Sequence, residues 1–117
     1  MDLGGDAPGE AWATVDVGPE HLNPNGVVHG AVLFAMVDTA MGRATMSVLD
    51  AGRFCASVEV QLRFIRPASA GVLRAEVIVV KRGTAIVHLE GRVHDDSGRL
   101  VATAAGTFAV IDLPAGT

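Results

Sequence analysis

Apolar and polar residues alternate along much of the chain. From Val58 to Ile65, apolar residues alternate with Glu59, Gln61 and Arg63, and a period of two is typical of a strand with one buried face. Similar segments predict strands over Leu73 to Lys81, Ala85 to Asp95 and Leu100 to Ile111, with a shorter strand over Ala11 to Val17. Turn residues such as Asp96-Ser97-Gly98 separate these segments, so we expect consecutive antiparallel strands.

One segment has the composition of a helix. Gly30 to Leu49 contains many good helix formers and no proline, and about twenty residues would form a helix about 30 Å long. Its apolar residues fall on nearly every side, which indicates a helix surrounded by protein. We therefore expect an α+β fold in which an antiparallel sheet of five or six strands wraps around one long central helix. A single domain should cover residues 1–117, with residues 1–10 forming a loose N-terminal segment.

Composition and charge exclude several classes of protein. Half of the 117 residues are hydrophobic and 19% are charged, which excludes intrinsic disorder. The net charge of −4, the single Trp and the absence of Tyr or a basic run argue against nucleic-acid binding. No apolar run reaches the roughly 20 residues that span a bilayer, and no signal-peptide pattern is present. With one cysteine, Cys55, which is expected to be a small buried residue, we predict a cytoplasmic protein.

A single acid lies in the middle of the predicted helix. Asp38 is flanked by Val37 and by Thr39-Ala40-Met41, and withdrawing a carboxylate from water costs several kcal/mol unless it gains a partner. Asp38 therefore pairs with a base such as Arg43, faces the surface, or is a functional acid in a polar cleft. These alternatives stay open at this point.

The predicted start of the helix is a second candidate site. The polar turn Asn23-Pro24-Asn25-Gly26 leads through Val27-Val28-His29 to Gly30. The first turn of a helix has N–H groups without intrahelical acceptors and carries the positive end of the helix dipole. Because Gly30 has no Cβ, a ligand oxygen can approach its backbone closely, and such a place can polarise a carbonyl. Alternatively, His29 caps the helix and Gly30 only allows close packing.

Asn23, His29, Gly30 and Asp38 fall within sixteen residues, and this spacing resembles a known family. Asn23 to Ala31 with Val37 to Gly42 is similar to the active-site segment of the hotdog-fold acyl-CoA thioesterases of the phenylacetate-degradation (PaaI-like) group. Later segments that also fit are Ser57-Val58-Glu59-Val60, Phe64-Ile65-Arg66-Pro67-Ala68 and residues 98–108, so the resemblance runs from about His21 to Ile111. Where the family usually reads His-Gly-Gly, this chain has Ala31, and we expect a modest change in the acyl pocket.

The resemblance implies a hotdog fold and hydrolysis of an acyl-CoA thioester to a free acid and coenzyme A. In that reaction, the Gly30 amide would stabilise the oxyanion, and Asp38 would activate water or attack the thioester directly. By the same analogy Asn23 would orient the water or the carbonyl, His29 would bind near the thioester and hold the loop, and Ser57 would help position the water beside Asp38.

Coenzyme A carries phosphates, for which Arg66, Lys81 and Arg82 are candidate ligands. No other cofactor and no metal is expected, because His21, His29, His88 and His94 lack the spacing of metal ligands.

The spacing of the two central residues also predicts self-association. Eight positions separate Gly30 from Asp38, which corresponds to about 12 Å along one helix. A carbonyl about 3 Å from the Gly30 amide cannot also lie beside Asp38 of the same helix, so the acid must come from another chain. A two-fold axis between antiparallel helices would create two such sites. We therefore expect an obligate homodimer with shared sites, and the resemblance extends this to a dimer of dimers.

Two other functions remain as alternatives. A non-catalytic acyl-CoA-binding hotdog protein would keep the fold without using the acid. A hotdog enoyl-CoA hydratase or dehydratase would use a histidine and an acid, but its histidine-containing, proline-rich loop is not evident in this sequence.

Overall fold

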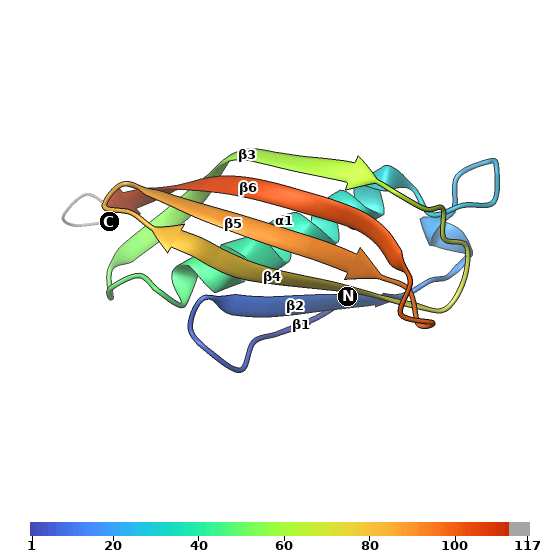
Figure 1. The fold of residues 1–117 in the computed structure, drawn as a ribbon, viewed down its shortest axis with the longest axis horizontal. Helices are drawn as coiled ribbons and strands as arrows, with labels where there is room; N and C mark the ends of the chain where they lie inside the picture. Colours follow the sequence, from blue (N-terminus) through green and yellow to red (C-terminus); the bar gives the residue numbers. More distant parts are fainter. Residues whose placement is uncertain (113–117) are drawn as a thin grey trace.

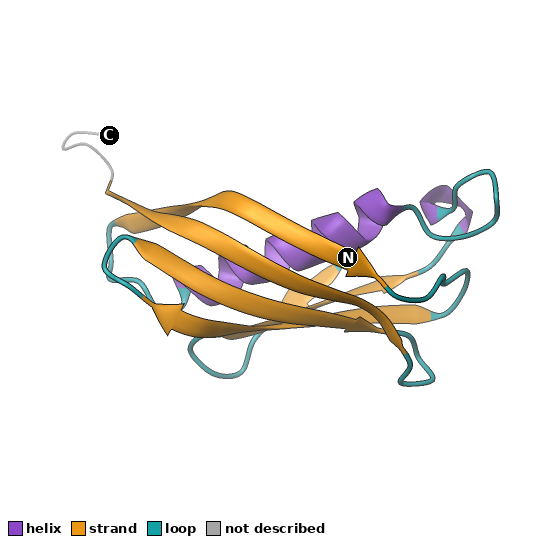
Figure 2. Cartoon of the chain, turned by 45° about the horizontal axis from the view of Figure 1, so that its top comes forward, coloured by secondary structure: helices purple, strands orange, loops and turns teal. Residues whose placement is uncertain are grey.

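The computed structural model describes residues 1–112, which form one antiparallel sheet and one long helix. The sheet order is β1-β2-β4-β5-β6-β3, and helix α1 lies along one face of the sheet (Figure 1). The elements are β1 (Asp2–Gly4), β2 (Glu10–Asp16), the short 3-10 helix η1 (Pro19–His21), α1 (Gly30–Met46), β3 (Arg53–Phe64), β4 (Val72–Arg82), β5 (Ile86–His94) and β6 (Leu100–Asp112). This α+β arrangement of six strands curved around a helix confirms the expected fold class (Figure 2).

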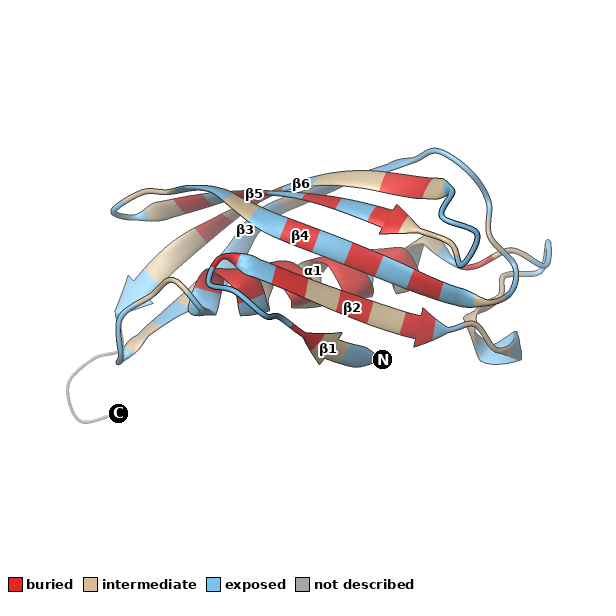
Figure 3. Ribbon diagram, turned by 60° about the horizontal axis from the view of Figure 1, so that its bottom comes forward, coloured by how far each residue is buried: buried red, intermediate tan, exposed pale blue. Residues whose placement is uncertain are grey.

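The core lies between α1 and the inner face of the sheet. Alternate residues of β4 and β5 are buried, and Figure 3 shows this as alternating red and pale blue positions along β4. The side of α1 that contacts the sheet contributes Leu33, Met36, Val37, Ala40, Met41, Ala44 and Thr45. Burying a side chain of the size of Leu or Met contributes about 1.5–3 kcal/mol, so this contact fixes the orientation of α1 on the sheet.

The other side of α1 is open in a single chain. Phe34 is 41% exposed and Met46 is also exposed, although the apolar character of all sides of the segment predicts a helix surrounded by protein. In a single chain, protein therefore covers only one side of α1.

Two predicted features differ in the structure. Residues 1–10 do not form a uniformly loose segment, because β1 pairs with β2 and half-buried Leu3 packs against the core. Strand β3 does not pair with β4, the next strand in sequence, but with β6. The connection from β3 to β4, residues 65–71, crosses the end of the sheet, so β4 pairs with β2 and β5 instead.

The two edges of the sheet differ in length. Strand β1 has three residues, whereas β3 has twelve and leaves one backbone edge without a neighbouring strand within residues 1–112. A bulge between Ser57 and Glu59 leaves Val58 62% exposed on this edge. Long apolar edge strands promote association with another strand. We call this edge, together with the exposed side of α1, the open face.

No helix within residues 1–112 has the length and apolar character needed to cross a membrane.

Candidate active site

Two separate hollows adjoin α1, one at its middle and one at its start. The first has a volume of about 540 Å³ and is lined by Asp38, Thr39, Cys55 and Ser57, among others. The second has a volume of about 380 Å³ and is lined by residues that include Gly30. The two residues that the sequence singles out therefore lie in different hollows of the same chain.

Asp38 lies half-buried at the wall of the first hollow. Arg43 lines the same hollow, but the ion pairs within residues 1–112 do not include Asp38. The described residues therefore show no ion pair between Arg43 and Asp38, in contrast to the first alternative. Asp38 lines a cavity. This position fits the alternative in which Asp38 is an acid in a cleft.

Strand β3 brings two more side chains to this hollow. Cys55 and Ser57 are two residues apart, so they point to the same side of the strand. The bulge that follows Ser57 changes the register of β3 against β6 and ends this alternation. The structure therefore brings Ser57 together with Asp38, from elements nineteen residues apart in sequence.

Cys55 is a residue of this hollow whose position the sequence did not reveal. Its Sγ lies 3.9 Å from the Gly42 carbonyl oxygen. Burial, and to a smaller extent the negative charge of Asp38, raises the pKa of the Cys55 thiol. Since the thiolate is the reactive form, Cys55 is suited to line the hollow rather than to attack a substrate. Its spacing of two from Ser57 is the signal that could have placed it there.

Gly30 is the first residue of α1. Its backbone N–H has no acceptor within residues 1–112, as expected for the first turn of a helix. A Cβ on Gly30 would lie 3.0 Å from Cζ of Phe64, the last residue of β3. The ring of Phe64 therefore lies directly against the start of the helix, and Gly30 permits this close approach.

The loop before α1 is held by its backbone and by Asn23. The side-chain oxygen of Asn23 accepts hydrogen bonds from the N–H groups of Asn25 (2.9 Å) and Val27 (3.3 Å). His29 occupies the position before the helix, but its exposed side chain makes no capping hydrogen bond. Asn23 and His29 thus flank the start of the helix, but the structure places neither among the residues that line the two hollows.

The three basic candidates lie in different places. Arg66 lines the same hollow as the start of the helix. Lys81 is exposed at the end of β4, and the guanidinium group of Arg82 donates hydrogen bonds to the carbonyl oxygens of Val48 and Gly83. Val48 follows the C-terminal end of α1, so Lys81 and Arg82 lie far from Gly30 within one chain. Residues 1–112 contain no group of three His, Cys, Asp or Glu side chains that could hold a metal ion.

Comparison with known proteins decides the family. The sequence profile of the Thioesterase superfamily matches residues 25–102. The chain belongs to the thioesterase superfamily. The matched segment contains Gly30, Asp38, Ser57 and Arg66, so the candidate residues of both hollows lie in the part of the chain that matches the superfamily.

Individual relatives agree with this assignment. A phenylacetic acid degradation-related protein of Ralstonia eutropha JMP134 is 31% identical, with a TM-score of 0.84 over 92% of this chain and 83% of that one. A Bacillus halodurans protein solved with CoA is also 31% identical, with a TM-score of 0.82 over 88% of this chain and 67% of that one. A Saccharolobus solfataricus protein named for a proposed esterase activity is 31% identical over 73% of this chain. The chain spans 56% of the length of that S. solfataricus protein.

Proposed function

We propose that this chain hydrolyses acyl-CoA thioesters to a free carboxylic acid and coenzyme A, at sites shared between two copies. The observation that carries the proposal is the position of Gly30 and Asp38 on one helix. They are separated by about 12 Å, and each lines its own hollow. The Thioesterase superfamily match and the relative solved with CoA support this reaction class.

The open face is the surface that we assign to the second copy. If two α1 helices run antiparallel across a two-fold axis, Gly30 of one chain faces Asp38 of the other when the axis passes near position 34, halfway between them. Phe34 is exposed at that position. Ala31 and Ala35 on the same side are small and exposed, and they allow two helices to approach closely. The free edge of β3 can then pair with its equivalent in the partner.

In this dimer each site would combine one helix start with the partner's acid. The Gly30 N–H and the positive end of the helix dipole would stabilise the oxyanion that forms when the thioester is attacked. The partner's Asp38 would take a proton from the attacking water, or would attack the carbonyl carbon itself to form a mixed anhydride. In either case the thiolate of coenzyme A leaves and takes up a proton. Ser57, which lines the hollow of Asp38, would position the water, and Arg66, which lines the hollow of Gly30, would bind a phosphate.

The experiment is thiol release from a panel of phenylacetyl-type and straight-chain acyl-CoAs. Removing a general base costs about 10²–10⁴ in rate, so Asp38→Asn should lose that much while the dimer stays folded. Arg43→Gln is the matched control, because Arg43 lines the same hollow without pairing to Asp38. Wild-type turnover in Asp38→Asn contradicts the assignment. An acyl-CoA-binding protein would retain ligand and release no thiol, and a hydratase would change the acyl chain and also release none.

We propose a reducing compartment such as the cytoplasm as the location. The support is limited to the single cysteine of the sequence, which is half-buried and unpaired. Cell fractionation with a tagged full chain tests this location directly.

A further inference from the structure

His21 is a residue to which the proposed reaction assigns no role. It is the last residue of η1, and nine positions separate it from Gly30 at the start of α1. Its side chain is 24% exposed, and it does not belong to the buried core cluster. The hydrogen bonds around His21 nevertheless connect η1 to the start of α1, so they bear on the position of the Gly30 amide.

Two hydrogen bonds close η1 between Gly18 and His21. The backbone N–H of His21 donates to the carbonyl oxygen of Gly18 at 3.0 Å. In the opposite direction, the Gly18 N–H donates to Nδ1 of the His21 ring at 2.8 Å. Because Nδ1 accepts a hydrogen bond, it carries no proton, and the neutral ring has its hydrogen on Nε2. The turn therefore depends on the neutral form of the His21 side chain.

The backbone of His21 extends this restraint to the helix. Its carbonyl oxygen accepts a hydrogen bond from the N–H of His29 at 2.9 Å, and His29 directly precedes Gly30. Beside this contact, Leu22 pairs with Val28 as an antiparallel bridge. The loop before α1 is thus a narrow hairpin, and the hydrogen bond made by His21 is the one next to Gly30.

We propose that His21 is a positioning residue, whose neutral ring holds this hairpin so that the Gly30 N–H stays directed at the thioester carbonyl. The inference rests on the proposed function, in which the Gly30 N–H stabilises the oxyanion. Such a donor works only within hydrogen-bond distance of the place where the negative charge develops, and a misplacement of about 1 Å can cost about 10² in rate. In this proposal His21 acts through the His29 N–H and does not contact the substrate.

Glu20 offers the ring a second partner when it takes up a proton. Oε1 of Glu20 lies 3.6 Å from Nδ1 of His21, and a Cβ on Gly18 would lie 2.5 Å from the other oxygen of that carboxylate. A protonated Nδ1 cannot accept the Gly18 N–H and would donate to Glu20 instead. Protonation of His21 would therefore release the bond that closes the turn. The adjoining segments contain three more ionisable side chains, Asp16, His29 and Arg66.

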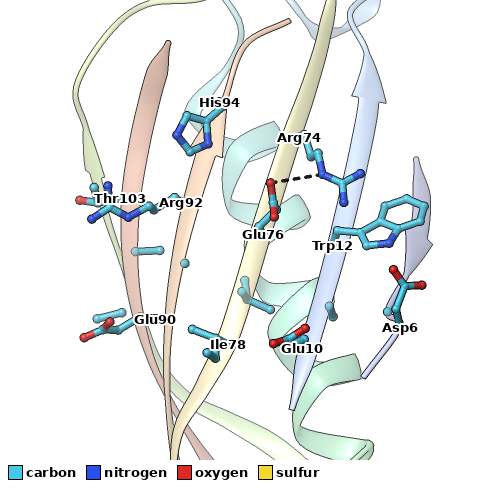
Figure 4. Close-up of a pocket in the computed structure, with 16 residues that line it drawn as sticks. Asp6, Glu10, Trp12, Arg74, Glu76, Ile78, Glu90, Arg92, His94 and Thr103 are labelled. Atoms are coloured by element: carbon cyan, nitrogen blue, oxygen red, sulfur yellow. Dashed lines mark ion pairs between the residues drawn. The ribbon is translucent and has the colours of Figure 1, made fainter. Parts of the chain in front are cut away.

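Three variants test His21 through hydrolysis of phenylacetyl-CoA or of the acyl-CoA in the panel that reacts fastest. His21→Ala removes the acceptor, so kcat should fall by about 10–10² while KM stays within about twofold, since the Gly30 N–H acts in the transition state. His21→Asn places an acceptor oxygen near the position of Nδ1 and should restore most of kcat. His94→Ala is the matched control and should keep the wild-type kcat, because His94 lines a separate hollow on the sheet face opposite α1 (Figure 4).

The pH dependence isolates the ring of His21 from the other ionisable groups. The quantity to plot is kcat of the wild type divided by kcat of His21→Asn, because Asp38 titrates in both proteins. Histidine can change its charge between about pH 5 and 8, whereas asparagine does not titrate. The ratio should fall over the pH range in which NMR signals of the His21 ring show uptake of a proton. A ratio that stays constant over that range overturns the proposal, and so does wild-type kcat in His21→Ala.

Hydrogen exchange separates a failure of this inference from a failure of the proposed function. The His29 amide donates to the His21 carbonyl oxygen, so its protection should fall about tenfold in His21→Ala, as expected for the loss of one hydrogen bond. His21→Asn and His94→Ala should keep the protection. If the wild type releases no thiol from any acyl-CoA, the proposed reaction is refuted, and lower protection in His21→Ala alone still supports His21 as the residue that holds the start of α1. Equal protection in all four proteins overturns the inference.

Discussion

Restoration of activity between two inactive variants tests whether Gly30 and Asp38 act in different chains. One variant is Asp38→Asn. The other is Gly30→Pro, which removes the backbone N–H donor at the first position of α1, where proline is well tolerated, and adds the carbons of the proline ring. The preceding residue, His29, already has φ −57° and ψ 137°, the extended conformation that a following proline requires. Gly30→Ala is the matched control, since it adds a Cβ near Phe64 but keeps the donor.

The expected magnitudes follow from the geometry. Losing one oxyanion-hole donor costs about 10²–10³ in kcat, so Gly30→Pro should fall by that factor while Gly30→Ala stays close to the wild type. In a fully exchanged equimolar mixture with Asp38→Asn, about half of the dimers are mixed. Each mixed dimer has one site with both intact residues and one site with neither. Gly30 and Asp38 are about 12 Å apart on one helix. If the two residues of one chain belong to different sites, activity should recover to about a quarter of the wild-type value.

The assay mixes the two variants, allows subunit exchange under mild denaturant, and follows thiol release after refolding. Each variant refolded alone supplies the baseline. Activity that stays at the mean of the two variants after exchange refutes the shared site, provided that mass spectrometry of differently tagged chains detects mixed dimers. A shared site is also refuted if recovery appears before any mixed dimer forms.

Three further changes have defined outcomes. Val58→Arg places a charge on the free edge of β3, so dimerisation through the open face should weaken at least tenfold, or about 1.4 kcal/mol, in sedimentation equilibrium. Gly106→Ala should lower the free energy of unfolding by about 1–3 kcal/mol in urea, because the new Cβ meets the Met41 sulfur; Ala105→Ser on the opposite face is the control. The backbone N–H of Arg99 lowers the pKa of Asp95 most; desolvation opposes this shift, and the Ser97 N–H and the Arg99 guanidinium add to it. The carboxylate therefore contributes stability above its unfolded pKa and loses it as pH falls through the folded pKa. Asp95→Ala should have a lower free energy of unfolding at neutral pH and should lack this loss of stability in acid. Plots of the free energy of unfolding against pH that run parallel for the variant and the wild type contradict this prediction.

The last three strands could be predicted closely because alternation and turn residues define them. In β5 the sequence places Val87 and Leu89 on one face and His88 and Glu90 on the other, and the first pair is buried while the second is exposed. The start of β3 could not be predicted in this way. Residues 53–57 lie on an edge strand, and Phe54, Cys55 and Ala56 follow one another without a polar residue between them, so no alternation of apolar and polar residues marks this segment. Alternation also carries no information about pairing, and β3 was found beside β6.

The candidate site was predictable only where it depends on a single helix. Gly30 and Asp38 are eight residues apart on a segment that is recognisably helical, so their separation follows from helix geometry. The proximity of Cys55 and Ser57 to Asp38 depends on how β3 packs against α1, and the bulge after Ser57 is not visible in the sequence. Asn23 has a structural role, since its side-chain oxygen accepts hydrogen bonds from the turn that leads to the helix.

The position of Asp38 couples assembly to chemistry in the proposed dimer. In one chain the carboxylate is half-buried beside an open hollow, where water can solvate it. Covering the open face would remove part of that water, and such a loss costs several kcal/mol unless another group compensates. The partner's helix start offers that compensation, because its N–H groups and the positive end of its dipole would face the acid. The same donors would bind the thioester carbonyl, so the partner's helix start would bring the carbonyl and the acid together in one site.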